Sequence, residues 1–143
     1  MKVIKHLIIV AAATLFTQHA MAEEAYQITA KAWTAMGEKN WAQAVELADK
    51  AIAIWGPQAK AANDELKEYP SEDEVEKYAN LNEIGTLLWI KGEALRQKGD
   101  EKEALAAYRL LLTKYKFAQC WDPNGWWWKP ATAAQEKIEE LGG

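Results

Sequence analysis

The chain has few of the side chains that most enzymes use for nucleophilic or metal chemistry. It has one cysteine, Cys120, one serine, Ser71, and two histidines, His6 and His19, which both lie within residues 1–22. If that segment is removed on export, no histidine remains. A Ser–His or Cys–His nucleophile, a metal site rich in histidine or cysteine, and haem attachment through C-x-x-C-H are then excluded. We therefore expect no metal, no cofactor and no catalytic residue of these classes.

Long apolar runs are also missing after residue 22. Residues 1–22 have the pattern of a secretory signal peptide, with a basic start, the apolar stretch LIIVAAATLF and the cleavage motif AMA at residues 20–22. The apolar stretch is too short to span a bilayer. We expect cleavage after this motif, a mature domain of residues 23–143 that is periplasmic or secreted, and no membrane-spanning segment.

Basic side chains are outnumbered by acidic ones. Loss of Lys2 and Lys5 with the signal peptide changes the formal charge from −4 to −6. Nucleic acids are held largely by basic faces that neutralise their phosphates. We therefore expect no nucleic-acid partner.

No stretch alternates polar and apolar residues with a period of two, and Ala, Glu, Lys, Leu and Gln dominate, so the sequence predicts an all-α fold. Pro57 is suited to the first turn of a helix, and Ser71 with Glu74 matches a capping box. With these boundaries we expect about six helices, over residues 24–36, 41–55, 58–69, 72–98, 102–115 and 131–141.

Two segments share a pattern of small and aromatic residues. In WIKGEALRQKGDEKEALAAYRLLL, residues 89–112, the positions are Gly92, Gly99, Ala104 and Tyr108, and in AWTAMGEKNWAQAVELADKAIAIWGP they are Trp41 and Ala44. These segments resemble tetratricopeptide repeats, over residues 26–57 and 85–116. The resemblance implies a short array of antiparallel helix pairs that mediates protein–protein interaction or scaffolding. The long segment between the two units makes the array irregular.

Each matching position also has a physical reason. Small residues at Gly92 and Ala104 allow two helices to approach closely, while Tyr108 and Trp41 fill the space beside them. Gly99 is suited to the left-handed residue that ends a helix, with the following aspartate as the next cap.

The stretch CWDPNGWWWKP, residues 120–130, places four tryptophans around a turn. Asp122-Pro123-Asn124-Gly125 favours a type I turn, which brings Trp121 back towards the three later indoles. We expect a tryptophan-rich loop over residues 116–130 and a helix over 131–141 to cap the last repeat, with Trp121 structural and buried.

The same residues also suit a ligand platform. Three consecutive indoles cannot all face inward, and sugar rings stack on indoles while polar groups bind their hydroxyls. The candidate binding residues are Trp126, Trp127, Trp128, Asp122 and Asn124.

Three functional classes follow from these features. The first is an exported, non-catalytic interaction module with a protein partner in the cell envelope, and the alternative is a carbohydrate-binding or β-glucan-related protein that uses the tryptophan loop. The third is a glycoside hydrolase, which needs only two carboxylates, although no carboxylate pair stands out. Cys120 is either a small buried residue or the donor of an intermolecular disulfide.

Overall fold

The computed structural model describes residues 23–143, so the predicted signal peptide lies outside the described residues. In chain order the elements are α2 (Ala25–Gly37), α3 (Trp41–Glu65), the short 3-10 helix η1 (Val75–Tyr78), α4 (Ala79–Lys98), α5 (Glu101–Lys114), β1 (Cys120–Asp122), β2 (Trp126–Trp128) and α6 (Pro130–Glu140). Residues 23–143 are therefore mainly helical, as predicted, with one small antiparallel sheet that was not expected. None of the described helices combines the length and apolar character needed to cross a membrane.

The described residues contain five α-helices and not about six, because two predicted helices are one. Pro57 lies inside α3 and does not begin a helix. Its ring removes one intrahelical hydrogen bond, but the helix continues because Ala59 and Asn63 beyond it are buried. The Tyr115 hydroxyl also donates to the carbonyl of Gly56, at 3.1 Å. Tertiary packing therefore outweighs the local effect of proline.

The predicted start of the fourth helix at residue 72 is wrong as well. The backbone N–H groups of Glu74 and Val75 donate to the Ser71 carbonyl, at 2.9 and 3.0 Å, so this segment is a turn and not a side-chain capping box. The chain then passes through η1, and α4 begins at Ala79. Burial of Val75 and its contact with Asn82 fix this shorter geometry.

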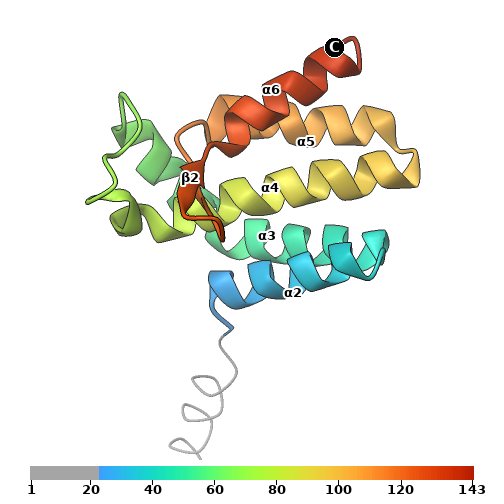
Figure 1. The fold of residues 1–143 in the computed structure, drawn as a ribbon, viewed down its shortest axis with the longest axis horizontal. Helices are drawn as coiled ribbons and strands as arrows, with labels where there is room; N and C mark the ends of the chain where they lie inside the picture. The colour runs from blue at the N-terminus through green and yellow to red at the C-terminus, as the bar shows by residue number, and fades with distance from the viewer. Residues whose placement is uncertain (1–22) are drawn as a thin grey trace, which may run out of the picture.

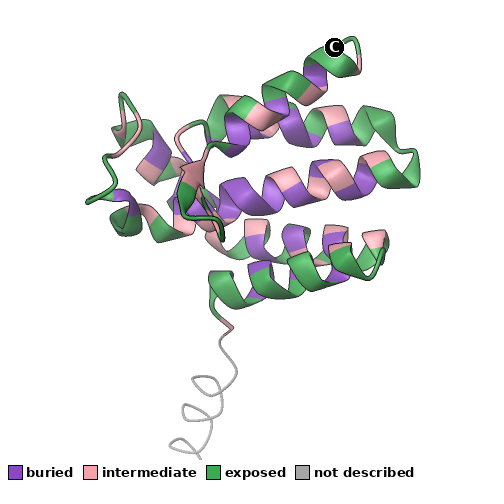
Figure 2. Cartoon of the chain, in the orientation of Figure 1, coloured by how far each residue is buried: buried purple, intermediate pink, exposed green. Residues whose placement is uncertain are grey.

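The helices lie side by side in chain order, and α4 is the central one (Figure 1). It packs against α2, α3, α5 and α6. Its buried side chains occur on most of its circumference, whereas the outer faces of α2 and α6 are exposed (Figure 2). The hairpin of β1 and β2 lies against α4, close to that helix's N-terminal half. The most buried helix of the domain therefore supports the tryptophan-rich segment.

Small residues bring α4 and α5 close together at the predicted positions. A side chain at Gly92 would place its Cβ 2.2 Å from the ring of Tyr108. A Cβ at Gly85 would lie 2.2 Å from the Cβ of Ala118, which follows the end of α5. Ala104 and, between α2 and α3, Ala44 are fully buried. These close contacts explain why larger residues do not fit there.

The remaining predicted structural residues have mixed outcomes. Gly99 ends α4 in the left-handed conformation, with φ of 86°, as predicted. Asp100 makes no side-chain cap for α5 and instead pairs with Lys98 at 3.4 Å. Trp41, the first residue of α3, is half-buried against the core.

Candidate functional site

The predicted loop over residues 116–130 is a β-hairpin in its central part. The N–H of Gly125 donates to the Asp122 carbonyl at 2.9 Å, which closes the predicted turn. Gly125 has φ of 98°, a value that glycine adopts without strain. A three-residue connection that ends in such a residue is a common hairpin loop. The Asp122 Oδ1 atom also accepts from the backbone and side-chain nitrogens of Asn124, both at 2.8 Å.

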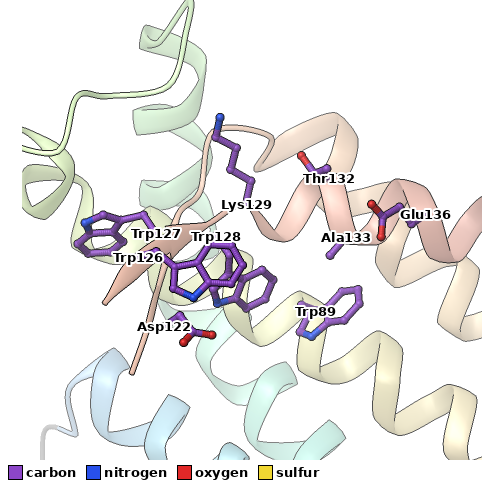
Figure 3. A pocket seen from close by; sticks show the side chains of 9 residues that line it. All are labelled: Trp89, Asp122, Trp126, Trp127, Trp128, Lys129, Thr132, Ala133 and Glu136. Carbon is purple, nitrogen blue, oxygen red and sulfur yellow. The ribbon is translucent and has the colours of Figure 1, made fainter. Parts of the chain in front are cut away.

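The strand register divides the tryptophans between two faces. Trp121 pairs with Trp127, and Asp122 pairs with Trp126. Because successive side chains of a strand point to opposite faces, Trp126 and Trp128 share one face while Trp121 and Trp127 share the other. The rings of Trp121 and Trp127 lie 5.2 Å apart, inclined at 64°. Figure 3 shows the Trp127 ring on the opposite side of the strand from Trp126 and Trp128.

An open groove of about 580 Å³ lies between the hairpin, α4 and α6, and we call it the tryptophan groove. It is lined by Trp89, Asp122, Trp126, Trp127, Trp128, Lys129, Thr132, Ala133 and Glu136 (Figure 3). Four of the five predicted binding residues therefore meet at one groove. The fifth, Asn124, lies in the exposed turn and contacts Asp122. Trp89 joins the groove from α4; its helical position in the sequence favoured a core role, with a groove-lining role as the alternative.

Aromatic contacts link the groove to the close contact between α4 and α5. The rings of Tyr108 and Trp89 lie 5.7 Å apart, and those of Trp89 and Trp128 lie 5.9 Å apart and nearly perpendicular. Gly92 allows Tyr108 to reach this position. The groove wall is thus supported by the buried core and does not rest on the hairpin alone.

Exposure distinguishes the indoles of the hairpin. Trp126 is 57% exposed, whereas Trp127 and Trp128 are half-buried. The prediction that Trp121 is buried is wrong, because it is 52% exposed. Its nearness in sequence to Phe117 suggested burial, but the register places it on the face of the hairpin opposite Trp128. Trp128 contacts Trp89 of the helical body.

Buried asparagines hold the chain that leads into the hairpin. Asn82 accepts the N–H of Gln119 at 2.9 Å and donates to the Val75 carbonyl at 2.9 Å. Asn63 accepts the N–H of Phe117 at 3.0 Å. Sequence reasoning missed both residues. For Asn82, the signal in the sequence was a polar side chain between the apolar Leu81 and Ile84 on a buried helix.

The polar groups of the tryptophan groove have mixed charge. The backbone N–H and the side-chain amide of Asn124 hydrogen-bond Asp122, and these bonds, together with the nearby Trp126 indole, lower the pKa of its carboxyl. Lys129 lies over the Tyr69 ring, 4.2 Å from its centroid. Thr132 and Glu136 are exposed on the α6 side. The groove therefore presents acceptors and donors around exposed indole faces.

The described residues 23–143 bear on two further questions raised by the sequence, metal binding and the state of Cys120. There, no three His, Cys, Asp or Glu side chains are grouped so that they could hold a metal ion. Cys120 is half-buried and free, and burial raises the pKa of its thiol. A raised pKa keeps the thiol protonated and less reactive.

Comparisons with known proteins complete the description of the site. No protein-family model, no curated protein and no solved structure matches the chain.

Proposed function

We propose that this protein is an exported, non-catalytic binding module and that the tryptophan groove holds an oligosaccharide. The observation that supports this proposal most directly is the groove itself, in which Trp89, Trp126 and Trp128 lie around an open space of about 580 Å³. Most ligand sites combine apolar and aromatic walls with a few polar groups that fix the orientation of the ligand. The tryptophan groove has this composition.

An oligosaccharide fits the two kinds of surface that the groove offers. The face of a pyranose ring carries C–H groups that pack on an indole, and its edge carries hydroxyls that both donate and accept hydrogen bonds. Asp122 and Glu136 supply acceptors, and Lys129 and Thr132 supply donors. The openness of the groove at the hairpin suits a chain that continues beyond the bound sugar.

The alternatives fit the same groove less well. Single-stranded nucleic acid also stacks on indoles, but its phosphates need a basic surface, and Asp122 and Glu136 would repel them. Hydrolysis of a glycosidic bond requires a protonated carboxyl as general acid. Asp122 has a lowered pKa and is therefore ionised at neutral pH. Binding without chemistry is the simpler assignment.

Calorimetric titration with neutral oligosaccharides tests this proposal. Cellohexaose, laminarihexaose and a peptidoglycan disaccharide are titrated into the mature protein, Trp126→Ala and Trp33→Ala. Trp33 is the matched control because it is also exposed, at 42%, and does not line the groove. We expect at least one sugar to bind the native protein, with a tenfold or greater loss in Trp126→Ala, about 1.4 kcal/mol.

Two results would count against the sugar. One is that none of the three sugars binds the native protein at millimolar concentration. The other is an equal loss of affinity in Trp126→Ala and Trp33→Ala, which would place the binding site elsewhere.

A protein partner in the cell envelope is the second candidate, and a different surface favours it. A groove of about 480 Å³ lies along α3, α4 and α5, with the apolar side chains of Val45, Ile52 and Leu110 in its wall. Charged side chains surround it, and Lys91 pairs with Asp49 across it. An amphipathic groove of this kind can hold a peptide segment.

Site-specific photocrosslinking separates the two candidates. A crosslinker at position 110 in α5 should capture a protein if a partner occupies the helical groove, whereas one at position 126 should capture none. Adducts from position 126 alone would instead place a protein at the tryptophan groove.

Export is part of the proposal and has its own test. The signal-like segment predicts a mature N-terminus at Glu23. Terminal sequencing of the protein from a periplasmic or secreted fraction should therefore read Glu-Glu-Ala. A product that keeps Lys2 would contradict export with cleavage.

A further inference from the structure

A second cavity lies beneath the other face of the hairpin. Its volume is about 420 Å³, and the indoles of Trp121 and Trp127 form one wall. The other lining residues come from α2, η1, α4 and the entry to β1, and they are Thr29, Glu76, Ala79, Asn82, Glu83, Thr86, Gln119 and Cys120. The hairpin thus borders two spaces, which share Trp127 as a lining residue.

Most polar groups of the second cavity already have partners within the protein. Asn82 uses its amide on Gln119 and Val75. The Gln119 side chain donates to the Pro70 carbonyl at 3.0 Å, and the Thr86 hydroxyl donates to the Asn82 carbonyl at 2.8 Å. These groups fix the wall but offer few free hydrogen bonds to a ligand. The tryptophan groove differs, because its polar side chains are largely exposed.

The carboxyl group of Glu83 lines this cavity and has no charged partner among the described residues. No lysine or arginine lines the cavity, and within residues 23–143 neither Glu83 nor Glu76 forms an ion pair. Burial raises the pKa of Glu83, and the nearby Thr29 hydroxyl offsets only part of that effect. A carboxylate that loses hydration without a counter-ion is costly. A ligand cation would supply the missing partner.

The indole faces point to the same ligand chemistry. Trp121 is 52% exposed, and its ring lies 5.2 Å from that of Trp127. An ammonium group is attracted to the face of an indole, most strongly when both are partly removed from water. A carboxylate and two indoles around one space form a site for an organic cation.

We propose that this second cavity binds the ammonium group of a small organic amine, with Glu83 as counter-ion and Trp121 and Trp127 as the aromatic wall. The inference does not rest on the oligosaccharide, since the two spaces share only Trp127 among their lining residues. Free amines and amino sugars carry the same group, so the experiment includes both.

The test compares two probes of the same shape. Cyclohexylammonium and cyclohexanol are titrated into the ¹⁵N-labelled protein while the indole N–H resonances of Trp121 and Trp127 are followed. We expect cyclohexylammonium to shift both resonances and to bind about tenfold or more tightly than cyclohexanol. Glucosamine against N-acetylglucosamine forms the second pair, and stronger binding of glucosamine would show that the site also accepts an amino sugar.

Variants then locate the charge that matters. Glu83→Gln should lose the preference for cyclohexylammonium, and Glu101→Gln, on the exposed first turn of α5, should keep it. The Glu83→Gln protein should also melt no earlier than the native protein, because it removes a poorly solvated charge. If it does so, a loss of binding cannot be attributed to unfolding. Equal binding of the two cyclohexyl probes, or full binding by Glu83→Gln, would overturn the proposal.

The pH dependence gives a further readout. Binding of cyclohexylammonium should strengthen as the pH rises through the raised pKa of Glu83, because only the ionised carboxyl attracts the probe. The other titratable groups that face this carboxyl are Glu76 of η1 and Cys120 of β1. Burial raises the pKa of the Cys120 thiol, which stays neutral over this range. Because the proposal assigns the attracting charge to Glu83, Glu76→Gln should keep the pH dependence and Glu83→Gln should abolish it.

Discussion

The helical body and the tryptophan hairpin place their aromatic rings in opposite ways. Tyr108 is fully buried between α4 and α5, where Gly92 makes room for its ring and its hydroxyl donates to Glu93. Trp126 is 57% exposed at the edge of an open groove. One ring stabilises the fold, and the other leaves apolar surface free. The difference supports our proposal that the body is a scaffold and that the hairpin is the part that meets a ligand.

The largest loss of stability should come from a larger side chain at Gly92, where α4 lies close to the ring of Tyr108. We expect Gly92→Leu to lower the free energy of unfolding by about 3 kcal/mol or more, because even a Cβ there would lie 2.2 Å from the ring. Gly37→Leu is the matched control, since nothing lies within 4 Å of a Cβ at that exposed position. It should change stability by about 0.5 kcal/mol or less. Similar denaturation midpoints for the two variants would show that the close contact is absent.

The next largest effect should come from the link between body and hairpin. Asn82→Ala leaves the Gln119 N–H and the Val75 carbonyl without their partner. We expect a loss of about 2 kcal/mol, the cost of unsatisfied buried groups, and faster amide exchange across β1 and β2. Asn80→Ala is a suitable comparison, because Asn80 bonds the exposed Gln58. Unchanged exchange in the hairpin of Asn82→Ala would disprove this link.

Within the hairpin, two tryptophans on the same face of β2 should respond differently to the same substitution, because they differ in burial. Trp128→Ala should cost about 1.5 kcal/mol, less than the roughly 3–5 kcal/mol of a fully buried tryptophan, because the ring is half-buried against Trp89. Trp126→Ala should cost about 0.5 kcal/mol or less. Thermal melts of the two variants decide the matter, and the reverse order would mean that Trp126, and not Trp128, packs against the helical body.

The smallest effect should come from the turn. The hydrogen bonds from Asn124 lower the pKa of Asp122, so its contribution is complete above the unfolded value of about 3.9 and is lost as the pH falls through the folded value. Asp122→Ala should therefore lower the melting temperature slightly at pH 7, by less than Trp128→Ala. The difference from the native protein should vanish at strongly acidic pH. A deficit that is equally large there would exclude an ionic origin.

The sequence predicted the scaffold better than the site. Gly92, Ala104 and Tyr108 could be assigned because close helix contacts need small residues at regular helical spacing. Strands of three residues are too short to show alternation, so the hairpin was missed although its turn was predicted. Trp121 was misplaced for the same reason, since only the register determines which face it occupies.

Other residues were missed because their partners lie far away in the chain. The role of Asn82 depends on Gln119, 37 positions later, and Glu83 becomes unusual only when the hairpin covers it. Neither relation is visible in local periodicity. The merged helix α3 shows the converse, because burial beyond Pro57 overrides a strong local signal.

An NMR titration with the tightest-binding neutral oligosaccharide reads all eight indole N–H groups in one experiment. If the tryptophan groove is the binding site, the resonances of Trp89, Trp126 and Trp128 should shift in proportion to occupancy, while those of Trp33, Trp41 and Trp55 should not move. Saturable shifts at Trp33, Trp41 or Trp55 with none at Trp126 and Trp128 would contradict the assignment of the groove as the ligand site.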